Sequence, residues 1–142
     1  MRASRRGTAG TDPTGRPHPD LTPGLFLIAD DVAGGFFAIN GGKLGEDVGN
    51  VYYWAPDDLD WEPLELGYSD LFYSAVNGGL DEFYADLRWT SWRADTRYLS
   101  RDRCFFFYPF LWTNEGSIEN SARNEVPVSE AFDLKTSFLP GF

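Results

Sequence analysis

Cysteine and histidine are almost missing from this sequence, which contains one residue of each. The histidine, His18, lies between Pro17 and Pro19 in a polar N-terminal segment, so we expect no histidine in the folded part of the chain. A Ser–His–Asp or Cys–His arrangement needs such a histidine, and zinc sites of the histidine and cysteine type need several of these ligands. The sequence therefore excludes both classes of site.

The single cysteine permits no intramolecular disulfide, which is typical of proteins in a reducing compartment and predicts a cytoplasmic location. Cys104 lies in the apolar run CFFFYPFLW, where a small buried hydrophobic residue is the simplest interpretation. A reactive thiolate is the alternative, because Arg101 and Arg103 are close in the sequence and a nearby cation favours the thiolate. Strand alternation gives neither arginine a fixed position at the sulfur.

Long hydrophobic runs and nucleotide-binding motifs are also missing. No run approaches the roughly 20 apolar residues of a membrane-spanning helix, and the basic N-terminus has no apolar segment of the kind found in secretory signals. Neither GxxxxGKS/T nor GxGxxG occurs, and the glycine pairs at 34–35, 41–42 and 78–79 indicate turns. We therefore expect no cofactor and no enzyme activity.

Positive charge is scarce, since 12 lysine and arginine residues stand against 22 aspartate and glutamate residues and the formal net charge is −10. Residues 1–20 contain four arginines and two aspartates, which leaves −12 on residues 21–142. Phosphate groups are bound by lysine and arginine, so we expect neither nucleic acid nor a membrane as a partner. A basic protein is the partner that this charge favours.

What the sequence does contain is a β-meander between Gly24 and Pro56. Three short apolar runs, Leu25–Ala29, Phe36–Ile39 and Val51–Ala55, are separated by DDVAGG and NGGKLGEDVGN. Apolar runs divided by turn residues that tolerate positive φ are typical of adjacent antiparallel strands.

Helical periodicity follows the meander. Apolar residues recur on one face of a helix over 69–76, whose stripe consists of Tyr68, Leu71, Phe72, Ala75 and Val76. A second helix over 80–88 carries the stripe Leu80, Phe83, Tyr84 and Leu87, and a third is expected over 91–98. Further on, the sequence predicts a strand buried on both faces at about Cys104–Tyr108, an edge strand at Val126–Val128 and a last helical turn in SEAFDLK.

These elements predict a single α+β domain over residues 21–142. We expect a mostly antiparallel sheet of about four to five strands that includes Cys104–Tyr108, with helices packed chiefly on one face. The preceding residues 1–20, rich in arginine, glycine, threonine and proline, predict a disordered tail because they have little to bury.

Aromatic residues make up 17% of the sequence, which is more than filling a core requires. Some rings should reach the surface near the acidic loop PDDLDWEPLELGYSD, where aromatics supply contact area and carboxylates orient a basic partner. The alternative is that the rings only fill the core. The predicted binding residues are Trp54, Asp57, Asp58, Asp60, Trp61, Trp89, Trp92 and Trp112.

The leading functional hypothesis is therefore a non-catalytic module that binds a basic protein. A second hypothesis is a cation-dependent hydrolase or cation-binding protein that uses Asp30, Asp31, Asp57 and Asp58, since hard cations prefer carboxylate oxygens. A solvated acidic loop is the simpler interpretation, because the spacing lacks the ligand order of an EF-hand.

The chain also resembles a known bacterial family. The strings LIADDVAGGFFAINGG, GNVYYWAPDDLDWEPLELGYSDLFY, GGLDEFYADLRWTSW, FFFYPFLWTNEG and RNEVPVSE, within roughly 25–132, resemble the family called domain of unknown function 2625. That family has no established activity. Its pattern is similar to that of the SUKH superfamily, and this second resemblance implies an α+β fold and an immunity protein that binds and neutralises a bacterial toxin.

One departure from the family concerns the N-terminus. Members have a further folded segment ahead of the strand that corresponds to Leu25–Ala29, whereas this sequence has only the Arg/Gly/Pro-rich tail. We expect either a misassigned start or a shortened domain, and a shortened domain would expose apolar surface. A third hypothesis is accordingly a truncated gene product without activity.

Overall fold

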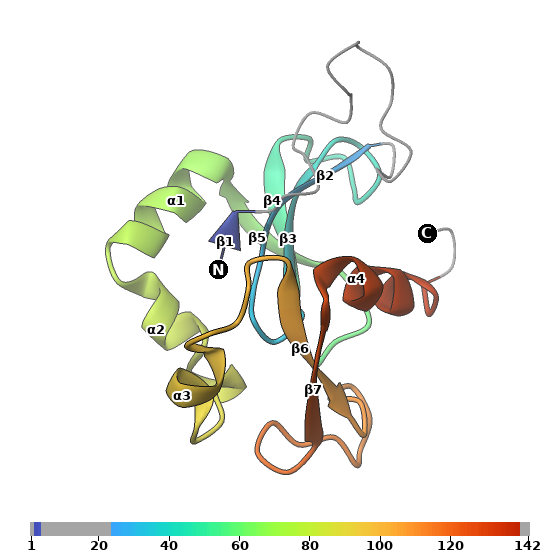
Figure 1. Cartoon of the computed structure of the whole chain (residues 1–142). Helices are drawn as coiled ribbons and strands as arrows, with labels where there is room; N and C mark the ends of the chain where they lie inside the picture. The colour runs from blue at the N-terminus through green and yellow to red at the C-terminus, as the bar shows by residue number, and fades with distance from the viewer. Residues whose placement is uncertain (1, 4–23, 140–142) are drawn as a thin grey trace.

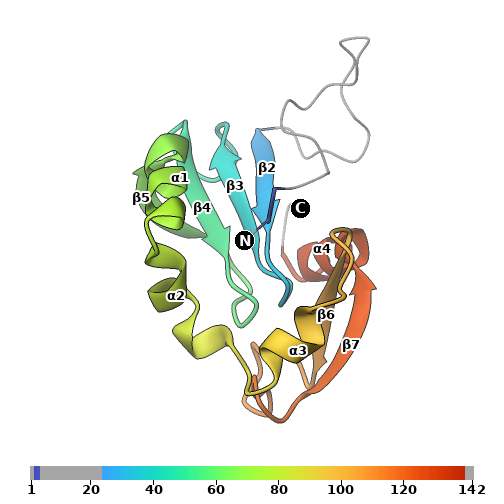
Figure 2. The ribbon, with the colours of Figure 1, turned by 60° about the vertical axis from the view of Figure 1, so that its left-hand side comes forward.

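The computed structural model describes residues 2–3 and 24–139. Its main sheet has five antiparallel strands in the order β1-β2-β3-β4-β5, which are labelled in Figure 1, and Figure 2 shows β2, β3, β4 and β5 side by side. The strands are β1 (Arg2–Ala3), β2 (Leu25–Asp30), β3 (Phe36–Asn40), β4 (Asn50–Trp54) and β5 (Glu62–Gly67). The predicted meander is thus confirmed. Of the tail predicted over residues 1–20, only Arg2–Ala3, which form β1, are among the described residues.

Two side chains explain why the chain turns where it does. Asp31 accepts hydrogen bonds from the backbone N–H groups of Ala33 and Gly35, at 3.0 and 2.7 Å, and so closes the turn between β2 and β3. The Asn40 amide, fully buried at the end of β3, donates to the Gly45 carbonyl and accepts from the N–H groups of Gly42 and Leu44. Side chains that satisfy buried backbone groups fix both connections of the meander.

The edge strand β5 was not predicted, because its segment was interpreted as an acidic loop. Leu64 and Leu66 are half-buried there, while Glu62 and Glu65 are exposed, which is the alternation of a strand with one covered face. Glu65 has φ of 59° and the register with β4 shifts beside it, so the strand is irregular. This irregularity masked the alternation in the sequence.

The two faces of the main sheet are covered by different elements, as Figure 2 shows. On one face, Phe37, Val51 and Tyr53 pack with Leu71 of α1 (Tyr68–Val76) and with Tyr84, which directly follows α2 (Gly79–Phe83). On the opposite face, the strand residues Phe36 and Trp54 pack with Phe132 of α4 (Val128–Thr136) and with Cys104. Because neighbouring strand residues point to opposite faces, β3 and β4 supply both cores.

The strand predicted at Cys104–Tyr108 exists, but its place in the main sheet was predicted wrongly. β6 (Arg103–Tyr108) pairs with β7 (Ala122–Pro127) in a separate two-stranded antiparallel sheet. The backbone N–H of Phe105 donates to the Val32 carbonyl at 2.7 Å, which ties this hairpin to the β2–β3 turn. The two buried residues of β6 point to opposite faces of the hairpin, since Cys104 packs in the cluster of Phe36 and Trp54 and Phe107 packs in the cluster of Trp89. Both faces of the strand are therefore partly covered, as predicted, although Tyr108 at its end is exposed.

The helices also differ in part from the prediction. The second helical segment breaks into α2 (Gly79–Phe83) and a 3₁₀ turn (Ala85–Leu87), and the third is the short α3 (Trp92–Thr96). The predicted last turn is the two-turn helix α4. Within the described part of the chain, no helix has the length and apolar character that crossing a membrane requires.

Candidate functional site

Three of the five tryptophans predicted to bind a partner lie in the interior. Trp54, Trp61 and Trp89 are at most 7% exposed, so the expectation that these rings reach the surface was wrong. The indole rings of Trp54 and Trp61 lie 5.2 Å apart, and the Trp54 N–H donates to the Asp58 carbonyl at 2.9 Å. These rings fill the core, which was the alternative interpretation for them.

The other predicted residues are accessible but lie on separate elements. Asp57, Asp58 and Asp60 are exposed between β4 and β5, whereas Trp92 belongs to α3. Trp112 lies in the loop after β6, half-buried and stacked on Phe110 at 4.6 Å between ring centroids. The eight predicted residues therefore do not form one surface.

The four carboxylates proposed for a cation are not brought together. Asp30 and Asp31 are each 3% exposed at the end of β2, while Asp57 and Asp58 are exposed beyond β4. Asp31 is occupied by the two backbone N–H groups of its turn and by the Tyr53 hydroxyl at 2.7 Å. Among residues 2–3 and 24–139, no group of three or more His, Cys, Asp or Glu side chains is placed to hold a metal ion.

The exposed aromatic side chains gather instead on α1 and the segment after it. Tyr68, Phe72, Tyr73 and Val76 of α1 are between 52% and 70% exposed, and Phe83 at the end of α2 is 39% exposed. We call these five residues the α1–α2 face. The sequence pattern had placed most of the α1 stripe against the sheet, but only Leu71 of this helix is buried.

Acidic residues are concentrated in the stretch of chain that includes the α1–α2 face. Residues 57–88 contain nine acidic side chains and one basic side chain, Arg88, and all nine acidic residues are exposed. They come from the β4–β5 loop, from β5 and from both helical segments, and they are Asp57, Asp58, Asp60, Glu62, Glu65, Asp70, Asp81, Glu82 and Asp86. Exposed rings and negative charge therefore occupy the same stretch of chain. The sequence alone did not show this, because it did not show which side of α1 faces the solvent.

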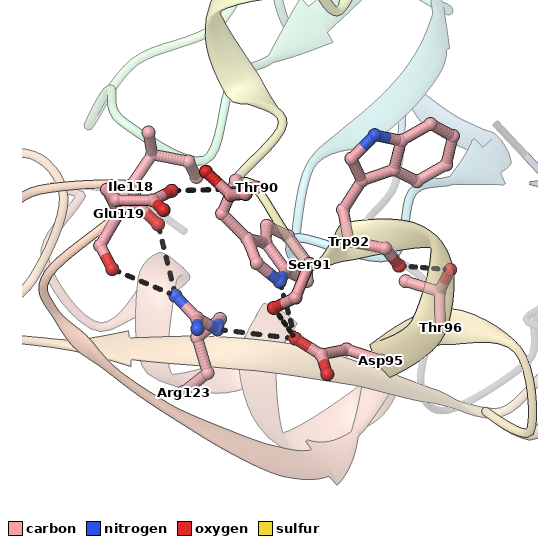
Figure 3. Close-up of polar contacts among 9 residues, drawn as sticks. Thr90, Ser91, Trp92, Asp95, Thr96, Ile118, Glu119 and Arg123 are labelled. Atoms are coloured by element: carbon pink, nitrogen blue, oxygen red, sulfur yellow. Dashed lines mark hydrogen bonds and ion pairs between the residues drawn. The ribbon is translucent and has the colours of Figure 1, made fainter.

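A polar cluster holds α3 against the loop before β7 (Figure 3). The Asp95 carboxylate accepts hydrogen bonds from the Ser91 hydroxyl and the Trp89 indole N–H, both at 2.7 Å, and lies 3.9 Å from the Arg123 guanidinium. The bond from Ser91, followed by that from Trp89, holds the pKa of Asp95 below its ordinary value.

The same cluster extends to Glu119. Its carboxylate accepts the backbone N–H of Thr90 at 2.9 Å, and hydrogen bonding by the Thr90 side chain, followed by this N–H, holds the pKa of Glu119 below its ordinary value. Arg123 donates to the carbonyl oxygens of Ile118 and Glu119. The Arg123 guanidinium also lies 5.1 Å from the centroid of the Trp89 ring. Because the bonds join residues about 30 positions apart in the chain, the cluster fixes the position of Trp89 and of α3.

One buried cation belongs to the opposite side of the sheet. Lys135 of α4 is 1% exposed and donates to the Ala55 carbonyl at 2.7 Å, and its ammonium lies 4.7 Å from the centroid of the Trp54 ring. Burial lowers the pKa of Lys135 to about 7, although Asp31 in particular opposes this shift. The Lys135 ammonium thus links α4 to the residue that follows β4.

The fold and its surfaces define an α+β protein whose main sheet is covered separately on its two faces. Residues 16–131 match the model of the family described as protein of unknown function DUF2625, and the chain belongs to that family. This confirms the first resemblance, whereas nothing tests the relation to the SUKH superfamily.

Two relatives illustrate the family. The chain is 51% identical over 108 residues to "Putative uncharacterized protein YbfG" of Escherichia coli (strain K12), which covers 76% of this chain and 49% of the relative. It is 40% identical over 89 residues to an "Uncharacterized protein" of Haemophilus influenzae (strain ATCC 51907 / DSM 11121 / KW20 / Rd), covering 63% of this chain and 39% of the relative. The chain thus spans about half the length or less of these relatives, and no solved structure matches it.

Proposed function

We propose that this protein is a non-catalytic binding module that holds a basic protein partner against the α1–α2 face. The observation that supports this most is the exposure of α1. This nine-residue helix buries only Leu71 and exposes three aromatic rings and a valine. An exposed apolar surface of this kind is typical of a site that contacts another molecule.

The residue types suit protein recognition. Tyrosine and phenylalanine give a large contact area with few rotatable bonds, and aromatic residues are enriched among those that dominate binding energy. Tyr68, Phe72 and Val76 are four residues apart and so lie in one row along the helix. Tyr73 widens that row, so the rings can act together on one partner surface.

The charge selects the kind of partner. Nine exposed carboxylates against one guanidinium between residues 57 and 88 attract a surface rich in lysine or arginine and repel an acidic one. Such a field accelerates encounter and falls with ionic strength, while the rings supply the short-range contact. The acidic loop at Asp57, Asp58 and Asp60 keeps its predicted role in this proposal, but the aromatic part moves from the tryptophans to α1.

In its finer form, the proposal is an immunity-type role in which the partner is a basic toxin domain that binding inactivates. The resemblance in pattern to the SUKH superfamily and the acidic, ring-bearing surface both favour this form. Co-expression tests it directly, because an immunity protein restores growth to cells that carry its toxin.

The experiment compares surface variants in binding to basic proteins encoded beside this gene, with affinity measured at low and high salt. Replacing two rings in a Phe72→Ser/Tyr73→Ser variant should weaken binding by about tenfold or more, since each ring is an exposed anchor. An Asp57→Asn/Asp58→Asn/Asp60→Asn variant should slow association and flatten the salt dependence.

The matched control is a Tyr98→Ser/Tyr108→Ser variant, because these tyrosines are 87% and 63% exposed outside the α1–α2 face. It should bind like the wild type. Equal loss in both aromatic variants would reject this face as the binding surface, and binding that ignores salt and the aspartate substitutions would reject the electrostatic part of the proposal.

A further inference from the structure

A pocket of about 190 Å³ lies between the β2–β3 turn and the segment that carries α2 and α3, the elements at the lower part of Figure 2. Its lining includes Asp31, Tyr84, Leu87, Arg88, Trp89 and Trp92. For scale, an apolar cavity of about 150 Å³ in another protein binds benzene. The pocket therefore has room for one ring and a short substituent.

The deepest charge in this lining is the Asp31 carboxylate. It is 3% exposed and its hydrogen-bond donors, the N–H groups of Ala33 and Gly35 and the Tyr53 hydroxyl, are all neutral. No described cation lies within ion-pair distance of it, and Lys135, which feels its charge, donates instead to carbonyl oxygens. A buried carboxylate without a contacting cation attracts a positive group.

Beside it lies a second buried polar group, the Tyr84 hydroxyl. Tyr84 is 8% exposed, and its hydroxyl makes no hydrogen bond of normal geometry with any described group, although it lies near Asp31 and Tyr53. Burial and the charge of Asp31 raise the pKa of Tyr84, so the hydroxyl stays protonated. Leaving such a group unpaired costs free energy, which a ligand that pairs with it would recover.

The remaining charge at the pocket is already compensated. Arg88 lies 3.0 Å from the Asp81 carboxylate, and its guanidinium stacks 4.3 Å from the centroid of the Trp92 ring. An anionic ligand would have to compete with Asp81 for Arg88 and would approach the buried Asp31. A cation meets neither obstacle, although guanidinium groups already lie over the rings of Trp92 (Arg88 and Arg93) and Trp89 (Arg123).

We propose that this pocket binds a small primary amine that carries a single apolar ring, with the ammonium group beside Asp31 and Tyr84 and the ring among Leu87, Trp89 and Trp92. The ammonium donates to the carboxylate and to the Tyr84 oxygen. The ligand thus supplies a hydrogen-bond partner for the Tyr84 hydroxyl.

The test titrates the protein with benzylamine, benzyl alcohol and benzoate at neutral pH and constant ionic strength, with binding measured by NMR shifts of the tryptophan indole N–H groups. Benzylamine should bind saturably and shift the Trp89 and Trp92 signals. Benzyl alcohol should bind about tenfold or more weakly because it carries no charge, and benzoate should not bind.

Two variants sharpen the result. Tyr84→Phe keeps the ring and should weaken benzylamine binding about fivefold without lowering the melting temperature, whereas Tyr98→Phe, which removes an exposed hydroxyl, should change neither. Leu87→Trp should fill the pocket and abolish binding. Equal affinity for benzylamine and benzyl alcohol, no saturable binding of benzylamine, or unchanged binding in Tyr84→Phe would overturn the proposal.

Discussion

The two nine-residue helices of this protein, α1 and α4, invert the usual relation between composition and burial. The sequence of α1, YSDLFYSAV, is the more apolar of the two, yet only Leu71 is buried. The sequence of α4, VSEAFDLKT, contains three charged residues, yet Val128, Ala131, Phe132 and even Lys135 are buried. An aromatic stripe on a helix therefore does not by itself show that the helix packs against its own sheet.

The largest expected effect on the free energy of unfolding comes from replacing one phenylalanine in each of the two helices. Phe132 of α4 is 5% exposed and meets the Phe36 ring at 5.1 Å, so Phe132→Ala should lower the free energy of unfolding by about 3–5 kcal/mol. Phe72 of α1 is 56% exposed, and Phe72→Ala should change it by about 0.5 kcal/mol or less. Urea unfolding measures both, and equal losses would show that α1 is a core helix.

A smaller effect concerns the charge that α4 buries. Because the pKa of Lys135 is about 7 in the folded chain and 10.5 is its ordinary value, the unfolded chain binds more protons between these pH values. The free energy of unfolding should therefore rise with pH across this window, by up to about 1.4 kcal/mol per pH unit from this group.

The Lys135→Met variant should remove that part of the pH dependence, whereas Leu134→Met, a partly exposed neighbour on the same helix, should keep it. Urea unfolding at several pH values from neutral to mildly alkaline measures the slope. An unchanged slope in Lys135→Met would show that the ammonium group is not desolvated, and that α4 packs less closely than described.

The smallest effect is local and concerns the segment that follows α2. The lowered pKa of Asp95 means that its stabilising bonds are present above the ordinary value of 3.8 and are lost as the pH falls through the lowered one. Asp95→Asn should loosen Trp89 and α3 at neutral pH, as acid does in the wild type, while leaving both sheet faces intact.

Hydrogen exchange over residues 89–96 and tryptophan fluorescence measure this loosening. The exposed Asp86→Asn variant is the control, since Asp86 lies just before the segment and outside the polar cluster. If exchange in Asp95→Asn rises across β3 and β4 as well, the cluster supports the whole fold, and α3 is not a separate unit of stability.

Local patterns were enough to predict much of the secondary structure. Turn residues and short apolar runs predicted β2, β3 and β4 within a residue or so, because the turns are held by residues only a few positions away, such as Asp31 and Asn40. The position of β6 could not be predicted in this way. Its pairing with β7 and its bond to Val32 depend on contacts between distant parts of the chain.

The candidate site shows the same limit. Composition correctly indicated that some aromatic residues are exposed, but it placed them on tryptophans, of which Trp54, Trp61 and Trp89 are buried. A strand residue faces one sheet surface or the other, and which surface is covered depends on elements elsewhere in the sequence. The pocket beside Tyr84 gave no signal in the sequence, because its walls come from segments about 50 residues apart.

The sequence by itself determined the scarcity of histidine and cysteine, the negative charge and the meander, since composition and short-range turn chemistry do not depend on packing. Only the tertiary structure decided which rings are core and which are surface, and which carboxylate lies beside an unpaired hydroxyl. Burial is a property of the surroundings of a side chain, and those surroundings are assembled from residues that no local pattern connects.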